Sequence, residues 1–329
     1  MLIAWMVVAA CIAGGLLADF IYRRYASGKI REIVENVPTF AAVPTRPLSS
    51  ATSFRISVDE DVELEACLHL PPVEPAGVIL FCPELHGNHW TALHYCPALL
   101  DAGYALLAFD FRNQGNSSVQ EGYDPIHWVT EFEMQDVAAV LRYVGADDQL
   151  RHLPVGVFGV SRGGSVALAA ACRHSQIQAV AVDSAYAALP LIRSFMYKFS
   201  RYVVPDWFFA RLPAWHIDVV LRQALARSER RRRCRYVHLE DHADRFEGQA
   251  LLITGTRDSY VTPRVTNDIS EIFSFRTSTW TVPRAKHNRS RERAAEEYDS
   301  RIVSHFRAML PVSVCDRAPA QPVLHQDAA

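Results

Sequence analysis

The stretch Val155–Val166 reads V-G-V-F-G-V-S-R-G-G-S-V and decides the fold. A run of β-branched and apolar residues ends in Gly159-Val160-Ser161-Arg162-Gly163, and the residues from Ser165 to Cys172 are typical of a helix. The order strand, sharp turn, helix places a serine at the tip of the turn, where flanking glycines leave room for a strained backbone. A Gly-rich turn with an incidental serine is the alternative; the strand and helix around it favour a nucleophile.

The composition excludes some classes of protein. The chain has 329 residues, half of them hydrophobic, which is enough for one large core. A formal net charge of −2 produces no global field that would recruit nucleic acid, so we expect no nucleic-acid partner. The seven cysteines, scattered along the chain, fit neither a disulfide framework nor a zinc site. We therefore expect reduced thiols in a domain that faces the cytosol.

The N-terminus is a long apolar run. Residues 1–18 carry no charge, and after Asp19 the run continues to Arg23-Arg24. A helix of about 22 residues spans about 33 Å, enough for a bilayer core of about 30 Å. We predict a transmembrane anchor over residues 1–24. A cleaved signal peptide and a buried core helix are the alternatives; the first needs a basic residue ahead of the run, and the second is disfavoured because the run is terminal and apolar all round.

Positive charges follow this anchor at Arg23, Arg24, Lys29 and Arg31. Because cytoplasmic flanks of membrane helices are enriched in Lys and Arg, this pattern places the following domain in the cytoplasm. The chain is thus predicted to be a single-pass membrane protein.

The remaining chain divides by composition. Residues 25–52 contain three prolines and a Ser/Thr-rich run, which predicts a linker. A globular domain is expected over residues 53–310, and the polar, Pro- and Ala-rich residues 311–329 indicate a disordered tail.

Short apolar runs alternate with helical periodicity through the domain. The predicted strands are 53–58 and 62–70 as a hairpin, then 77–82, 104–109, 155–160, 178–182, 250–254 and 278–282. The predicted helices are 91–102, 128–144, 165–172, 263–273 and 290–309. Strands rich in Val, Leu and Ile that alternate with helices indicate a mostly parallel sheet covered by helices on both faces.

Residues 184–247 interrupt this alternation, because no strand pattern occurs in them. They predict a helical cap inserted between two strands. Aromatic residues crowd the cap: Tyr186, Phe195, Tyr197, Phe199, Tyr202, Trp207, Phe208, Phe209 and Trp215. These rings either pack the cap onto the core or form an apolar acyl pocket above Ser161.

The order of motifs resembles the α/β-hydrolase superfamily over roughly residues 53–310. The resemblance rests on four places: His86-Gly87-Asn88 after one strand, Gly159-Val160-Ser161-Arg162-Gly163 after a later one, Asp258 in G-T-R-D-S-Y-V-T-P, and His287 in A-K-H-N. Ser, Asp and His follow one another in the order that this fold uses. The stretch Asp110–Gly115 (D-F-R-N-Q-G) also looks like the D-x-R-x-x-G turn of lipase- and serine-aminopeptidase-like members.

The resemblance implies a role for each of these residues. Ser161 would be the nucleophile, His287 the general base, and Asp258 the carboxylate that holds the imidazole in the correct tautomer. The backbone amides of Arg162 and Asn88 would form the oxyanion hole. The alternatives are an ordinary hydrogen-bonding His287, a turn-capping Asp258, and Asp183 as the acid at the end of the strand after Ser161.

Other polar groups have plainer interpretations. His86, His89 and His94 suggest a metal site, but no carboxylate or cysteine cluster completes it, so we expect neither a metal nor an organic cofactor. His86 is expected to brace the oxyanion loop and Asp110 to cap its own loop. The run Arg230–Arg233 is typical of a solvated helix face, with a membrane-apposed patch as the alternative.

Together these features predict a membrane-anchored serine hydrolase that cleaves an ester, thioester or amide through an acyl-enzyme, a carboxylic ester above all. Its partner would be a small, apolar acyl substrate. An acyltransferase on the same fold and a hydrolase-fold binding module without catalysis are the alternatives.

Overall fold

The computed structural model of the protein describes residues 1–37, 42–45, 53–200, 211, 213–274 and 276–310. An eight-stranded sheet has the order β1-β2-β4-β3-β5-β6-β7-β8. The strands are β1 (Ser53–Ser57), β2 (Glu63–His69), β3 (Val78–Cys82), β4 (Ala105–Phe109), β5 (Val155–Val160), β6 (Ile177–Asp183), β7 (Gln249–Gly255) and β8 (Thr277–Val282). The pairs β1–β2 and β2–β4 are antiparallel, and every other pair is parallel. The predicted mostly parallel sheet is confirmed.

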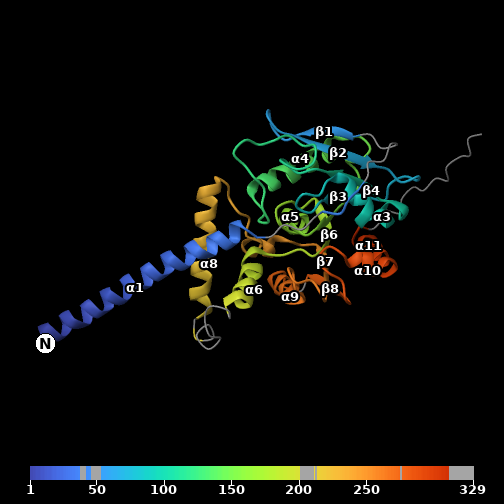
Figure 1. The fold of residues 1–329 in the computed structure, drawn as a ribbon. Helices are drawn as coiled ribbons and strands as arrows, with labels where there is room; N and C mark the ends of the chain where they lie inside the picture. Colours follow the sequence, from blue (N-terminus) through green and yellow to red (C-terminus); the bar gives the residue numbers. More distant parts are fainter. Residues whose placement is uncertain (38–41, 46–52, 201–210, 212, 275, 311–329) are drawn as a thin grey trace, which may run out of the picture.

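Helices cover both faces of this sheet (Figure 1). In the globular domain outside the cap they are η1 (His89–Thr91), α2 (Ala92–Tyr95), α3 (Pro97–Asp101), α4 (Glu131–Ala146), α5 (Arg162–Ala171), α9 (Pro263–Ile272), α10 (Ser290–Arg293) and α11 (Ala295–Met309). The cap contributes α6 (Ala188–Ser200), α8 (Ala214–Arg232), η2 (Leu239–Asp241) and η3 (Ala243–Arg245). The helix that begins the chain is α1 (Leu2–Glu35).

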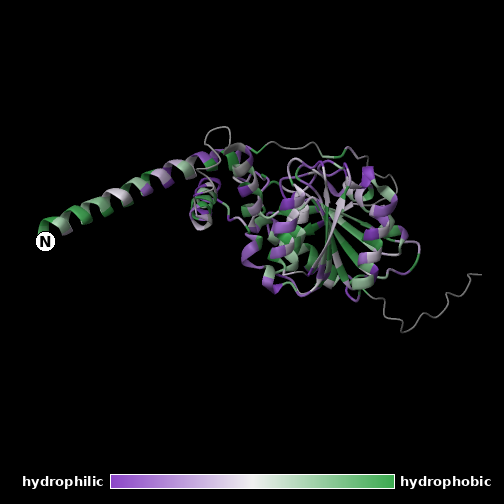
Figure 2. Cartoon of the chain, turned by 90° about the horizontal axis from the view of Figure 1, so that it is seen from below, coloured by the Kyte–Doolittle hydropathy of each residue, from purple (hydrophilic) through white to green (hydrophobic). Residues whose placement is uncertain are grey.

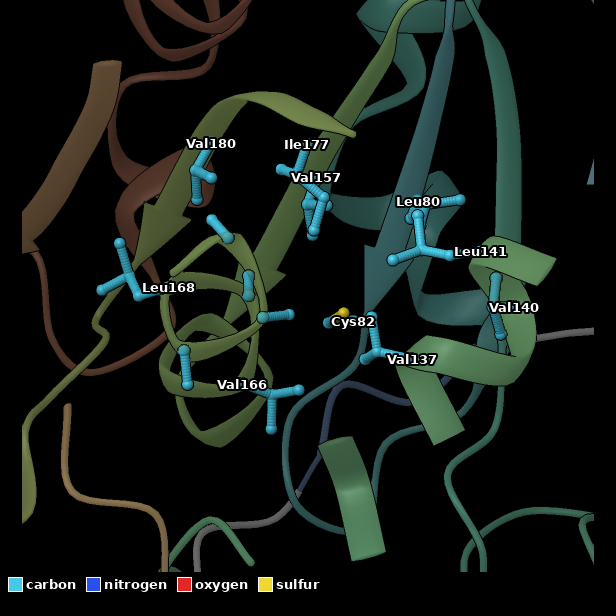
Figure 3. Packing of buried hydrophobic residues seen from close by; sticks show 14 of the residues in the cluster. Leu80, Cys82, Val137, Val140, Leu141, Val157, Val166, Leu168, Ile177 and Val180 are labelled. Carbon is cyan, nitrogen blue, oxygen red and sulfur yellow. The ribbon is translucent and has the colours of Figure 1, made fainter. Parts of the chain in front are cut away.

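Side chains that alternate along the central strands build two separate cores. In β3, Leu80 and Cys82 belong to the cluster beneath α4 and α5, whereas Ile79 and Phe81 belong to the cluster beneath α3 and α11. Figure 3 shows Leu80, Cys82 and Val157 on the sheet face that α4 and α5 cover. Because successive strand residues point to opposite faces, a strand buried on both sides must be apolar throughout, and this is why β3, β4 and β5 are continuous apolar runs.

Two predicted helices are interrupted. The helix expected over residues 91–102 breaks at Cys96, which leaves the helical conformation before Pro97 starts α3. Proline disfavours the helical conformation in the residue before it, and it has no N–H to continue the ladder. The helix expected over 290–309 breaks at Ala294, where φ is −146° and ψ is 58°. The helix expected from residue 128 begins three residues later, at Glu131, where Thr130 provides a capping box with Glu133.

The N-terminal helix is longer than predicted. We expected a linker to begin at residue 25, but α1 continues without a break to Glu35. Its last turns are held by packing, because Ser27, Ile30 and Val34 are buried against the globular domain. The remainder projects away from the domain, and its hydropathy is highest toward the N-terminus (Figures 1 and 2).

This helix is long and apolar enough to cross a membrane, with none of its most apolar window buried. Length and composition alone do not separate an anchor from a signal sequence near the N-terminus.

The described part of the cap (residues 184–247) is helical and has no strand of the sheet; Tyr236 forms one isolated bridge with Thr130. The predicted residues Tyr202, Trp207, Phe208 and Phe209, and the tail over 311–329, lie outside the described residues.

Candidate active site

The turn between β5 and α5 holds Ser161 in an unusual conformation, with φ 51° and ψ −119°. Its amide donates a 2.8 Å hydrogen bond to the carbonyl oxygen of Asp183 at the end of the neighbouring strand β6. A Cβ at Gly159 would lie 2.5 Å from the carbonyl oxygen of Gly163, and a Cβ at Gly163 would lie 2.1 Å from that of Cys82. Glycine is therefore required on both sides of Ser161, and the strained backbone is held in place by its surroundings.

Three of the predicted residues form one hydrogen-bonded chain. Ser161 Oγ lies 2.9 Å from His287 Nε2, and His287 Nδ1 lies 2.7 Å from Asp258 Oδ2. The second carboxylate oxygen of Asp258 accepts hydrogen bonds from the amides of Tyr260 and Val261, both at 2.8 Å. These amides fix the carboxylate, which in turn selects the imidazole tautomer with its free nitrogen toward the serine.

The rival acid Asp183 is used differently. Its carboxyl group accepts hydrogen bonds from Ser184 Oγ at 3.0 Å, from Ser290 Oγ at 2.9 Å and from the Tyr298 hydroxyl at 3.3 Å. Burial raises the pKa of Asp183 to about 6, and the hydroxyls of Ser290 and Ser184 oppose that rise. Asp183 thus ties the turn at Ser161 to the start of α10, just after His287, while Asp258 is the carboxylate bonded to the imidazole.

Arg162 is the first residue of α5, so its amide has no acceptor within the helix and is available beside Ser161. The other predicted donor, Asn88, precedes η1, and its side-chain oxygen accepts the amide of Trp90 at 3.0 Å. Between β3 and Asn88, the His86 amide donates to Gln114 Oε1 and the Gly87 amide donates to the carbonyl of Glu84. These two amides are therefore unavailable as donors to an oxyanion.

Leu85 is a second candidate that sequence reasoning missed. Its amide makes no hydrogen bond within the described part of the chain. It follows Cys82 and Pro83, whose carbonyl oxygens pack against Gly163 in the turn between β5 and α5. Along the chain, Leu85 is nearer than Asn88 to Cys82, the last residue of β3. This nearness to the end of the apolar strand is the signal in the sequence that could have identified Leu85 as a donor.

The buried ion pair of the Arg162 side chain is the main feature of the site that the sequence analysis did not predict. Its Nη2 lies 2.8 Å from Glu133 Oε1 and 3.0 Å from the Tyr123 hydroxyl, and both charged groups are at most 1% exposed. Glu133 also accepts hydrogen bonds from Tyr123 and from the amide and hydroxyl of Thr130. The T-E-F-E capping-box pattern at 130–133 could have located Glu133, but not its partner from another helix.

An aromatic contact joins the site to the cap. The Tyr260 ring lies 5.2 Å from the His287 ring, edge to face, and 5.2 Å from the Phe195 ring of α6. Tyr260 and Val261 share one hydrophobic cluster with cap residues of α6 and α8 and with Ile30 and Val34 of α1. The cap therefore packs directly on the loop that holds Asp258, and the end of α1 belongs to the same cluster.

The loop after β4 is organised by Asp110, as predicted. Its carboxylate accepts the amide of Asn116 at 2.9 Å and contacts both the amide and Nδ1 of His89. His94, which the sequence grouped with His86 and His89 as a possible metal site, has Nε2 3.7 Å from Glu292 Oε1. No group of three or more potential metal ligands occurs among the described residues.

A parallel sheet with a nucleophile turn, and with an acid and a base on later loops, defines the α/β-hydrolase class. The model of the alpha/beta hydrolase family matches residues 79–301, and the chain belongs to this family. A search of curated proteins found no match.

Solved structures of the same fold are similar at low sequence identity. The esterase Pf2001 of Pyrococcus furiosus is 19% identical, over 83% of this chain and 99% of its own, with a TM-score of 0.58. Est1E of Butyrivibrio proteoclasticus with bound ferulic acid is 19% identical, over 77% and 99%, with a TM-score of 0.53. XC6422 of Xanthomonas campestris, a serine hydrolase without a lid, is 19% identical, over 82% and 100%, with a TM-score of 0.53.

Proposed function

We propose that the protein is a membrane-anchored serine hydrolase that cleaves an acyl bond, most readily a carboxylic ester, through an acyl-enzyme. The observation that carries this proposal is the chain Ser161 Oγ, His287 and Asp258, with distances of 2.9 and 2.7 Å. The contacts are those that a serine nucleophile, its base and the orienting acid require.

In the first half of the reaction, Ser161 Oγ attacks the acyl carbonyl carbon and passes its proton to His287 Nε2. The amide of Arg162 and one amide of the 85–88 loop, that of Leu85 or Asn88, stabilise the negative charge that develops on the carbonyl oxygen. The imidazolium then protonates the leaving alkoxide, which departs and leaves the acyl group on Ser161. Asp258 stabilises the imidazolium and does not itself take the proton.

In the second half, His287 removes a proton from a water molecule that attacks the acyl carbon. Collapse of this second tetrahedral intermediate breaks the bond to Ser161 Oγ, which regains its proton from His287. If an alcohol or amine replaces water at this step, the protein is an acyltransferase. Product analysis with and without added acceptor separates the two outcomes.

The anchor is supported by α1, whose exposed apolar part is followed by Arg23, Arg24, Lys29 and Arg31. This charge pattern favours a cytoplasmic hydrolase domain. The burial of Ile30 and Val34 ties the C-terminal end of α1 to the cap, so a retained α1 would leave the domain at a fixed place. Protease added to intact cells should leave the domain uncut; digestion would reverse the proposed orientation.

An alkyl fluorophosphonate probe tests the catalytic proposal, since it labels only an activated serine. The full-length protein should be labelled, and Ser161→Ala should abolish both labelling and ester turnover. Ser175→Ala is the matched control, because Ser175 is an exposed serine just after the other end of α5. A folded wild-type protein that is not labelled would instead support a binding module without catalysis.

A further inference from the structure

The end of the apolar part of α1 is marked by aromatic and basic residues. Tyr22, Arg23, Arg24 and Tyr25 follow the uncharged run, and Arg23 pairs with Asp19 at 2.7 Å. Tyr and Trp gather at both faces of a bilayer, and Arg snorkels to the same level. If α1 is the anchor of the proposed function, on which this inference rests, these residues lie at the membrane–water interface.

The start of the cap helix α8 is held at that level. The His216 ring stacks on Tyr22 at 5.7 Å with an interplanar angle of 18°, and the Arg23 guanidinium lies 5.7 Å from the centre of the Trp215 ring. Figure 1 shows α8 crossing α1 where α1 leaves the domain, and the two helices are in contact. The side chains at the beginning of α8 therefore sit beside the residues that end the apolar run.

Trp215 is exposed although its helix is firmly packed. It is 60% exposed, whereas Ile217, Val220 and Leu221 of the same helix are buried in the cluster that contains Ile30 and Val34. A hydrogen bond of 2.7 Å from Arg227 Nη1 to the carbonyl of Arg24 adds a second tie between the helices. Because α8 is fixed to α1 in this way, Trp215 cannot turn inward without breaking that packing.

The basic run Arg230–Arg233, at the other end of α8, is a poorer candidate for a contact with the membrane. Arg231 lies 3.8 Å from Glu35, Arg232 pairs with Asp124 at 3.0 Å, and Arg230 Nε donates to the carbonyl of Ala226 at 3.1 Å, so three of its four arginines have partners within the protein. The alternative of a membrane patch made by the whole Arg230–Arg233 run is therefore not favoured. The apolar and aromatic start of α8 is the better candidate.

We propose that Trp215 is a second membrane contact, with its indole in the headgroup region of the bilayer that α1 crosses. The partner is a phospholipid surface, because the exposed ring is tied to the point where the anchor emerges. The cap then rests on the membrane, and the cluster containing Tyr260, which touches His287, lies directly beneath it. The substrate class that fits this placement is an amphiphilic acyl ester that resides in the bilayer.

Depth-dependent quenching of tryptophan fluorescence tests the contact in the full-length protein reconstituted into phosphatidylcholine vesicles. In a Trp5→Phe/Trp207→Phe background the remaining tryptophans are Trp90, Trp128, Trp215 and Trp280, of which only Trp215 is exposed. Lipids brominated near the headgroup should quench this background protein, and the further change Trp215→Phe should reduce that quenching about twofold or more. Trp280→Phe, at a residue only 7% exposed, is the matched control and should not reduce it.

The outcomes separate the inference from the proposal beneath it. If the background protein fails to float with the vesicles, the anchor is wrong and the contact falls with it. If it floats but Trp215→Phe leaves the quenching unchanged, the anchor stands and the contact is refuted. Unchanged turnover of a soluble acetyl ester in Trp215→Phe, with slower turnover of an ester embedded in the vesicle, would support the contact; equal loss on both esters would contradict it.

Discussion

Replacing Glu133 by glutamine tests the buried ion pair beneath the nucleophile turn. The substitution keeps the size of the side chain and removes its charge. It leaves the Arg162 guanidinium, 1% exposed, without an anionic partner at the 2.8 Å contact. The Tyr123 hydroxyl can still donate to the side-chain oxygen, but the amide nitrogen of glutamine then faces the Thr130 amide, which is also a donor.

The expected cost follows from this isolation of a buried cation. Removing one partner of a buried ion pair costs about 3–5 kcal/mol, because the remaining charge stays out of water without compensation. Retention of the Tyr123 contact favours the lower end, about 3 kcal/mol, or roughly a hundredfold in the folding equilibrium constant. Arg162→Met combined with Glu133→Gln should cost less than Glu133→Gln alone, since no unpaired cation remains.

Denaturant titration of the full-length protein in detergent micelles, followed by near-UV circular dichroism, measures the difference. Glu131→Gln is the matched control on the same helical turn. Its carboxylate pairs with Arg173 at 2.6 Å but is 42% exposed, so its loss should cost less than about 1 kcal/mol. Equal shifts for Glu133→Gln and Glu131→Gln would refute the reasoning.

Three further predictions concern the acid, the pH dependence and the acyl chain. Asp258→Asn should lower kcat by about 10⁴-fold, because it leaves the imidazole in the wrong tautomer, whereas Asp183→Asn should be mild; steady-state kinetics that rank them in reverse would assign the acid to Asp183. The folded-state pKa of Asp183, raised to about 6 from 3.8, means that its contribution to stability is present at low pH and lost as pH rises through about 4 to 6. Wild type should therefore lose stability relative to Asp183→Asn as pH rises from about 4 to about 6, and a constant difference in melting temperature would exclude this. Each buried methylene contributes about 0.8 kcal/mol, so kcat/KM for p-nitrophenyl esters should rise roughly a hundredfold from acetyl to hexanoyl. Phe195→Ala, Trp207→Ala or Phe208→Ala should flatten that trend, and a flat profile in the wild type would remove the apolar acyl pocket.

The parts of the fold that the sequence predicts are those set by local pattern. Continuous apolar runs gave β3, β4 and β5, because strands buried on both faces leave no polar position. Glycines two positions from Ser161 predicted the turn for a steric reason that the structure bears out at Gly159 and Gly163. Asp258 and His287 each follow a predicted strand, 250–254 and 278–282, which placed both on loops after the ends of neighbouring strands.

Contacts between segments far apart along the chain could not be predicted from local sequence patterns. The last turns of α1 carry local helical signals, such as the pair of Arg31 with Glu35, but the packing of Ile30 and Val34 on the cap is not visible in the sequence. The partner of Arg162 comes from α4, and the choice between Leu85 and Asn88 depends on how a loop folds against Gly163. In each case the decisive neighbour lies far away along the chain.

The central claim is a covalent intermediate on Ser161, and rapid acid quenching followed by peptide mass spectrometry tests it most directly. During turnover of p-nitrophenyl butyrate, the peptide that contains Ser161 should gain the mass of one butyryl group, and Asp258→Asn should slow the gain. In Ser161→Ala neither the mass gain nor the burst of p-nitrophenol should occur. Wild-type release of p-nitrophenol with no acylated peptide, or with the acyl group on another residue, would contradict the account.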